Sequence, residues 1–215
     1  MVPYPAALDL PHALVEWVTM LIVTREGDRR CKLPPHKRAL VALADRAPGL
    51  LKTLREHDPD YVLLDGTLSE CDRLGDARAD YSHKHRRHGV NVQIVTDPQG
   101  QLLWISPALP GRAHDRTAAR THRIIRIRER QGVPIVADRA YIGAGSWVTT
   151  AIRRPPNGEL SPTERTLNRA LAQARAPVER GVARLKSWRI FRRSRCSPNR
   201  MTDIAAAVLT LERQR

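Results

Sequence analysis

Hydrophobic and polar positions follow two different patterns along the chain, and the change falls near residue 60. Before it, three short helices are predicted, over residues 12–23, 33–45 and 48–57. The first is apolar on all sides, which is typical of a buried helix, and the second opens with a Pro-Pro pair that suits a first helical turn. Residues 1–59 are therefore predicted to form a helical segment that precedes a separate domain over residues 60–215.

From residue 61 onward the pattern favours strands. Residues 61–67 form a short apolar run that ends in Asp-Gly, which predicts a buried strand leading into a turn. Residues 90–97 alternate, the turn sequence DPQG follows, and residues 101–109 are apolar again, so a hairpin is expected. Residues 133–141 predict a second buried strand, which also delivers an aspartate at its end.

Three helices are predicted after the hairpin, over residues 114–130, 164–188 and 202–214. His114 or Asp115 is the expected N-cap of the first, and Gly132 is expected to end it. Pro177 lies inside the second and predicts a kink or a restart, because proline removes a helical hydrogen bond. Strands that alternate with helices in this way indicate a mixed α/β fold.

Composition adds a strong preference for polyanionic partners. The 215 residues carry a net charge of +15, and residues 161–215 alone hold 13 basic and 4 acidic side chains. Nucleic acid is the leading partner class, and an anionic membrane surface is second. The three cysteines are far apart, which excludes a CxxC motif. No apolar run has the length of a membrane span and no signal peptide is evident, so a cytoplasmic, nucleoid-associated protein is expected.

Three acidic residues stand out in this basic chain. Asp65 and Asp138 each end a predicted strand, and Glu179 lies in a strongly basic segment. Taken one at a time, Asp65 is equally well explained as a turn residue and Asp138 as a cap. Glu179 alone is better explained as an ion-pair partner of Arg175 or Arg180.

Taken together, three converging carboxylates indicate a metal site. Such groups repel one another and raise their own pKa values, and divalent cations relieve that repulsion. Oxygen ligands suit Mg²⁺ or Mn²⁺, and two such ions stabilise the attacking and leaving oxygens of phosphoryl displacement.

The motifs YVLLDGTL, YSHKHRRHGVNVQIV, LPGRAHDRTAAR, IVADRAYIGAG and RAPVERGVARLKSWRIFRR resemble DDE-type transposases of bacterial insertion sequences, in the group related to insertion sequence five and Harbinger elements. The resemblance covers about residues 33–211. It implies a ribonuclease-H-like fold with Asp65, Asp138 and Glu179 as catalytic residues that bind two Mg²⁺ or Mn²⁺ ions. Arg175, Glu179 and Lys186 match the R-x3-E-x6-K signature, whereas Ala172 stands where the family often has tyrosine.

The same resemblance implies metal-dependent cleavage and strand transfer on double-stranded DNA, at element ends and in target DNA, by a homodimer or higher oligomer. Eight basic residues are the expected DNA contacts, namely Lys84, Arg86, Arg87, Arg175, Lys186, Arg189, Arg192 and Arg193. His114 and Asp115 resemble a His-Asp pair of the family that supports the metal ligands, although a helix N-cap explains them equally well. A zinc site at His83, His85 and His88 is a weaker alternative to a basic loop.

The N-terminal region departs from the family pattern. Members carry a helix-turn-helix before the catalytic domain, and here only about fifteen residues separate Ala44 from Asp60, fewer than the roughly 20 that such a motif needs. The alternative function is therefore a truncated or inactive transposase remnant that only binds DNA.

Overall fold

A mixed β-sheet forms the centre of the computed structural model, which describes residue 20 and residues 35–72, 78–194, 196 and 198–214. The sheet path runs β2-β3-β1-β6-β7, with β4 and β5 added on β3 and β8 added on β1. The strands are β1 (Val62–Cys71), β2 (Tyr81–Ser82), β3 (Arg87–Thr96), β4 (Leu102–Ile105), β5 (Leu109–Pro110), β6 (Ile135–Ala137), β7 (Val148–Thr150) and β8 (Arg193–Ser194).

Strand directions divide the sheet into two parts. Strand β1 runs antiparallel to β3, and β3 antiparallel to β4, which confirms the predicted hairpin. On its other side β1 runs parallel to β6, and β6 parallel to β7. Parallel strands need covering on both faces, which explains why β1 and β6 are made of apolar runs such as Val62–Leu64. The expected mixed α/β class is confirmed.

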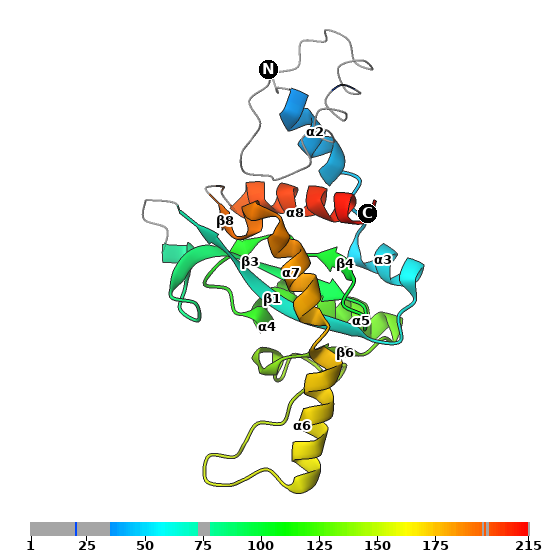
Figure 1. Cartoon of the computed structure of the whole chain (residues 1–215), viewed down its shortest axis with the longest axis vertical. Helices are drawn as coiled ribbons and strands as arrows, with labels where there is room; N and C mark the ends of the chain where they lie inside the picture. The colour runs from blue at the N-terminus through cyan, green and yellow to red at the C-terminus, as the bar shows by residue number, and fades with distance from the viewer. Residues whose placement is uncertain (1–19, 21–34, 73–77, 195, 197, 215) are drawn as a thin grey trace.

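Helices pack around the sheet (Figure 1). They are α2 (Pro35–Ala44), α3 (Leu50–His57), α4 (Asp115–Thr121), α5 (Ile124–Gln131), α6 (Pro162–Arg175), α7 (Val178–Ser187) and α8 (Pro198–Glu212), with the 3₁₀ turns η1 (Arg78–Asp80), η2 (Arg139–Tyr141) and η3 (Arg189–Phe191). Helix α7 contacts β1 and β3, α4 contacts β3 and η2, and α8 contacts β4. Within the described residues, no helix is long and apolar enough to span a membrane.

The N-terminal helices belong to the same packed body. Leu50 and Leu54 of α3 lie in the main hydrophobic core, and α2 packs against α8. The Thr210 hydroxyl donates a hydrogen bond to the Leu43 carbonyl, and Arg213 pairs with Glu56 at 2.6 Å. The helices predicted over 33–45 and 48–57 are confirmed, whereas the one predicted over 12–23 lies outside the described residues.

Two predicted boundaries were wrong. Strand β1 does not end at Asp65, because Asp65 and Gly66 stay in the ladder opposite Ile94 and Gln93 of β3, and the strand continues to Cys71. The single helix predicted over 114–130 is two helices, since Arg123 adopts a left-handed conformation (φ 56°) between α4 and α5. Gly132 caps α5 at φ 68°, as predicted.

Helix α6 and the loop before it extend away from the sheet as an arm (Figure 1). None of the α6 residues is buried. A capping box starts the helix: the Ser161 hydroxyl accepts from the Glu164 amide, and the Glu164 carboxylate accepts from the Ser161 amide. The predicted break at Pro177 is confirmed, because α6 ends at Arg175 and α7 restarts at Val178.

Candidate active site

Asp65 and Asp138 lie side by side on neighbouring strands. Leu64 of β1 pairs in register with Ala137 of β6, and the two aspartates are the next residue on each strand. Neighbouring strands are about 4.8 Å apart, and residues at the same level of a parallel pair point to the same face. The sheet register therefore brings both carboxylates to one place, although one lies within its strand and the other follows it.

One oxygen of each aspartate is fixed by the backbone. Oδ1 of Asp65 accepts from the Gly66 amide at 2.8 Å, and Oδ1 of Asp138 accepts from the Ala140 amide at 2.8 Å. The second bond also caps η2, as expected for an aspartate before a helical turn. Each carboxylate keeps its second oxygen for other partners.

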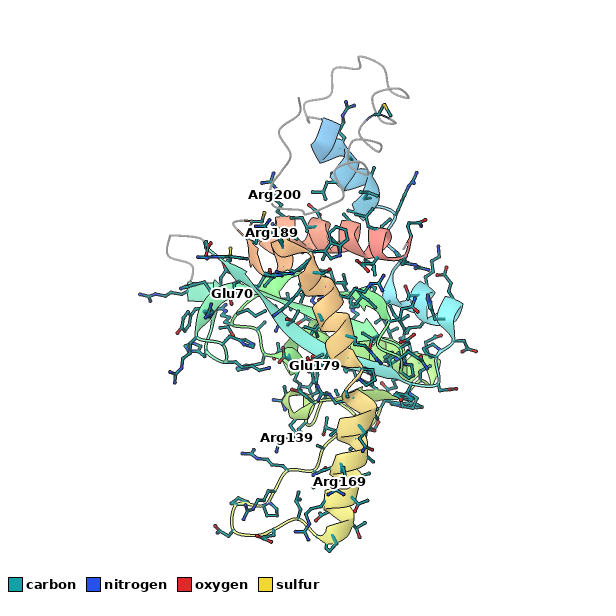
Figure 2. All side chains as sticks on the ribbon, in the orientation of Figure 1. Glu70, Arg139, Arg169, Glu179, Arg189 and Arg200 are labelled. Carbon is teal, nitrogen blue, oxygen red and sulfur yellow. The ribbon has the colours of Figure 1, made fainter. Side chains whose placement is uncertain are left out.

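Helix α7 brings the third acid, Glu179, in its first turn. The turn between β3 and β4 holds that end of the helix: Arg180 donates to the Gln99 carbonyl at 2.8 Å. Gly100 and Gly181 permit the close approach, since a Cβ on Gly100 would lie 2.2 Å from the Pro177 carbonyl oxygen and one on Gly181 would lie 2.4 Å from the Thr96 side chain. Figure 2 shows Glu179 at the end of α7 that meets α6.

The charges of the other two acids act on Asp65. Burial raises the pKa of Asp65 to about 6, the Arg175 guanidinium opposes that rise, and the charges of Asp138 and Glu179 add to it. Burial is thus the main cause of the raised pKa, and repulsion from the other two acids is a smaller contribution. Within the described residues, however, no three His, Cys, Asp or Glu side chains are grouped closely enough to hold a metal ion.

Arg175 supplies the counter-charge in this arrangement. Its Nη2 atom lies 3.6 Å from Oδ2 of Asp65, and both side chains are mostly buried. The alternative explanation of Glu179 as a partner of Arg175 or Arg180 does not fit, because Arg175 faces Asp65 and Arg180 bonds the backbone. Within the described part of the chain Glu179 makes no ion pair.

A second group of polar side chains lies on the opposite face of β1, centred on Asp115. Lys84 Nζ lies 2.8 Å from Oδ2 of Asp115, and Asn91 Nδ2 donates to Oδ1 at 2.8 Å. Asp115 is only 7% exposed. A Cβ on Gly66 would lie 2.1 Å from Oδ1 of Asp115, so this site requires glycine next to Asp65. We call Lys84, Asn91, Gln93, Asp115 and Tyr141 the Asp115 cluster.

The Asp115 cluster continues to η2, the turn that follows Asp138. Gln93 donates to Oδ1 of Asn91 at 2.7 Å and accepts from the Tyr141 hydroxyl at 2.5 Å. Burial and the Asp115 charge raise the pKa of Tyr141 well above its ordinary value, so the hydroxyl stays a neutral donor. Because Tyr141 ends η2, the cluster links β1, β3, α4 and the turn after Asp138.

The predicted DNA contacts separate into two groups. Lys84 and Arg175 lie at the carboxylates, although Lys84 pairs with Asp115. Arg87 pairs with Glu70 and Arg193 pairs with Asp72, both near the far end of β1. Arg86, Arg189 and Arg192 are exposed, and Lys186 is half-buried. Figure 2 shows Arg189 at the end of α7 opposite Glu179, so these eight residues do not form one patch.

The histidines singled out in the sequence do not contact the three acids through any hydrogen bond or ion pair of the described residues. His114 is the N-cap of α4 without a side-chain hydrogen bond, so its side chain is not tied to the carboxylates through that role. His83 and His88 each pack edge-on against Tyr81, with ring centroids 5.2 and 5.1 Å away. The described residues thus give no support to the zinc alternative at this loop.

Comparison with known proteins identifies the family. Residues 64–213 match the family model described as DDE superfamily endonuclease, which is more than half of the chain. The chain belongs to this superfamily. No curated protein and no solved structure matches it. Members of the DDE superfamily are nucleases that act on DNA and generally use divalent metal ions, and all three acids fall within the matched residues.

Sequence reasoning missed Asn91, Gln93 and Tyr141 of the Asp115 cluster. A signal for the first two was present, because Asn91 and Gln93 are polar residues two apart in the otherwise apolar run over residues 90–95 and therefore share one face. Tyr141 had no such signal, since its partner lies 48 residues away. The Asp115 cluster depends on contacts between distant elements, so only part of it could be found from the sequence of this DDE endonuclease.

Proposed function

We propose that this DDE endonuclease is the transposase of an insertion sequence, which cleaves DNA strands and transfers them with divalent metal ions. The observation that carries the proposal is the register that sets Asp65 beside Asp138, with the Glu179 charge acting on Asp65. The net charge of +15 supports DNA as the substrate.

The strand order supports a ribonuclease-H-like fold. Three antiparallel strands, β4, β3 and β1, continue into the parallel pair β6 and β7. In α/β sheets, sites form beyond the carboxyl ends of parallel strands, and the parallel pairing of β1 with β6 ends just before the two aspartates. Asp65 on β1 and Asp138 after β6 occupy this place.

The three acids have the ligand chemistry of a hard divalent cation, although their side chains are not grouped closely enough in this structure to hold one without moving together. Asp65, Asp138 and Glu179 offer only oxygen ligands, and two of them are adjacent on the sheet. Burial is the main cause of the raised pKa of Asp65, and the charges of Asp138 and Glu179 add to it, in the direction that a bound cation would reverse. We assign two Mg²⁺ or Mn²⁺ ions to these three residues. When bound, such ions activate an attacking oxygen and stabilise the charge of the leaving oxygen.

The other residues position the DNA and the acids. Lys84 and Arg175 place positive charge at the edge of the carboxylates, where a DNA phosphate binds. The Asp115 cluster lies behind Asp65 and reaches η2 through Tyr141, so it holds the two aspartates at a fixed distance. Gly100 and Gly181 let α7 approach closely enough to bring Glu179 to the site.

Replacing Asp138 by alanine tests the proposal. Nicking of duplex DNA in Mg²⁺ is expected to fall on the order of a hundredfold or more, because one of two adjacent ligands is lost. Salt-sensitive DNA binding is expected to remain, since binding depends on the basic residues. Glu129→Ala, at an exposed acid of α5, is the matched control and is expected to nick normally.

The outcomes separate the candidates. Unchanged nicking by the Asp138→Ala protein would show that the acids are misassigned. Salt-sensitive binding by the wild-type protein without nicking, in Mg²⁺ and in Mn²⁺, would instead favour the remnant that only binds DNA.

A further inference from the structure

Helix α7 carries Glu179 in its first turn and reaches α8 at its other end (Figure 1). Two side chains at that end, Arg184 and Trp188, bond the same carboxylate, which is that of Glu212 in the last turn of α8. Trp188 Nε1 donates to Oε1 at 2.7 Å, and Arg184 Nε donates to Oε2. Both oxygens of one acid therefore hold the helix that carries Glu179.

Glu212 is a buried charge whose bonds contribute geometry more than stability. Its side chain is 2% exposed, whereas that of Arg184 is 45% exposed. Well-packed apolar side chains of similar volume are often as stabilising as a buried ion pair, because the pair loses its hydration. What the pair adds is a fixed arrangement of its two partners. The arrangement fixed here is that of α7 relative to α8.

The carboxylate of Glu212 is itself held by the rest of the fold. Leu209 and Leu211, in the same turn of α8, lie in the main hydrophobic core. The next residue, Arg213, pairs with Glu56 of α3 at 2.6 Å. These contacts do not involve α7, so α8 presents the two oxygens of Glu212 at a fixed place.

Both ends of α7 are tied to the same antiparallel part of the sheet. At the first end, Arg180 bonds the Gln99 carbonyl in the turn between β3 and β4. At the second end, Glu212 belongs to α8, which packs on β4. The exposed arm α6 takes no part in either attachment. The place of α7 over the sheet is therefore set by β3, β4 and α8.

The bonds to Glu212 also fix the rotation of α7 about its own axis. The buried residues of α7 pack on the sheet, but apolar packing is non-directional. Arg184 lies five residues after Glu179, so the two side chains leave the helix roughly 140° apart at about 100° per residue. A rotation of α7 that breaks the bond to Glu212 therefore turns Glu179 relative to Asp65.

We infer that Glu212 is a positioning residue of the nuclease site: by holding the end of α7, it sets the rotation that keeps Glu179 beside the two aspartates. The inference rests on the proposed function, because it takes Glu179 as a metal ligand. Functional side chains must be held within roughly 0.5 Å of the productive geometry. Residues that orient metal ligands typically change metal affinity or activity by roughly 10- to 100-fold when they are replaced.

Metal affinity, measured apart from nicking, reports the position of Glu179. Urea unfolding of the full-length protein is followed at pH 7 in EDTA and at increasing Mn²⁺, and the dissociation constant of Mn²⁺ is obtained from the rise in stability. For Glu212→Ala we expect this constant to be about tenfold higher than for the wild-type protein. A role confined to stability would lower the value in EDTA and leave the dissociation constant unchanged.

A matched control and a double variant separate positioning from a general loss of packing. Glu56→Ala removes a carboxylate that pairs with Arg213 at the same end of α8 and with Lys52 of α3, and it is expected to leave the dissociation constant unchanged. In a Glu179→Gln background, adding Glu212→Ala is expected to cause no further loss of Mn²⁺ affinity, because the residue that Glu212 positions no longer binds the metal.

Two milder variants keep the test decisive if Glu212→Ala does not fold. Trp188→Phe keeps an aromatic ring and removes only the donor to Glu212, and it is expected to raise the dissociation constant less than Glu212→Ala. Glu212→Gln keeps an acceptor for Trp188 and is expected to retain part of the lost affinity.

The possible failures are distinguishable. An unchanged dissociation constant for Glu212→Ala, or for Trp188→Phe where Glu212→Ala does not fold, would overturn the positioning role and leave the proposed function standing. A further loss of affinity in the Glu179→Gln background would do the same. No stabilisation of the wild-type protein by Mn²⁺ would instead reject the metal site, and the positioning role with it.

Discussion

Two neighbouring helices, α4 and α5, each bury a charged side chain, and the two charges differ in their hydrogen-bond partners. Asp115 of α4 is surrounded by donors: Lys84 and Asn91 bond its two oxygens at 2.8 Å each. Arg128 of α5 is fully buried, yet its Nε and Nη1 have no partner among the described residues, and Nη2 reaches only the Pro134 carbonyl at 3.4 Å. Burial alone lowers the pKa of Arg128 to about 10.

The difference lies in the partners: those of Asp115 connect it to the candidate site, whereas Arg128 has almost none. The partners of Asp115 come from several elements and lead to Asp65 and η2, so its burial fixes the relative position of the candidate metal ligands. The guanidinium of Arg128 contacts one carbonyl of the adjacent loop and fixes nothing at the site. A buried charge stabilises a fold only where its partners compensate for the lost hydration.

Removing Asp115 is expected to have the largest effect. Asp115→Ala takes the acceptor from Lys84 and the shorter of two acceptors from the buried Asn91 amide, which keeps only the Ala113 carbonyl at 3.2 Å. We expect the free energy of unfolding in urea to fall by about 3–5 kcal/mol. Asp115→Asn, which keeps an acceptor oxygen, is expected to lose less.

The exposed Glu129→Ala serves as control for Asp115→Ala and is expected to change stability by less than about 0.5 kcal/mol. A loss this small for Asp115→Ala as well would show that the Asp115 cluster does not hold the sheet and α4 together. The comparison between the two buried charges would then lose its basis.

Asp65, on the other face of β1, also tests whether hydrogen-bond donors compensate a buried charge for its lost hydration. Its donors do not compensate it fully. Its pKa of about 6 is above the ordinary 3.8, so the folded state is destabilised as pH rises through that window and the full effect is present at pH 7. In EDTA, Asp65→Asn is expected to raise the free energy of unfolding by up to roughly 3 kcal/mol at pH 7. The gain is expected to vanish below about pH 4, where Asp65 is protonated in both states.

Adding Mg²⁺ is expected to affect the stability of the wild-type protein and of Asp65→Asn differently. If the three acids bind Mg²⁺, millimolar Mg²⁺ stabilises the wild-type protein and has much less effect on the variant. Equal stability of both proteins in EDTA at pH 7 would contradict the raised pKa of Asp65. Equal stabilisation of both by Mg²⁺ would remove Asp65 from the metal site.

Which parts of the fold the sequence could predict depends on how far apart in the sequence the interacting residues lie. Local patterns predicted the hairpin, the break at Pro177 and the cap at Gly132, because each depends on neighbouring residues. The predicted end of β1 was wrong because it too relied on neighbouring residues, and Asp-Gly is typical of a turn. Gly66 instead lies within the strand, where glycine is needed because Asp115, 49 residues further on, approaches closely.

The candidate site shows the same division. Asp65 and Asp138 stood out because each follows a short apolar run, and parallel pairing of β1 with β6 brought them together. The roles of Tyr141 and Gly66 depend on contacts between distant elements, which no local pattern reports. Arg128 was hidden for a different reason: in the sequence RIIRIRER it looks like its neighbours Arg126 and Arg130, which are exposed.

Arg128 gives the smallest of the expected effects, and its sign is the opposite of that for Asp115. Arg128→Met keeps a long apolar side chain in the space and removes the buried guanidinium. Replacing a poorly compensated buried charge in this way is often neutral or stabilising, so we expect the free energy of unfolding to rise by about 1–2 kcal/mol.

Arg126→Met and Arg130→Met, at exposed positions on the same helix, control for the change in net charge and helix propensity. A loss of stability with Arg128→Met, beyond that of these controls, would mean that Arg128 is compensated after all, and the contrast between α4 and α5 would disappear. DNA nicking is expected to be unchanged, because Arg128 touches neither the acids nor the Asp115 cluster.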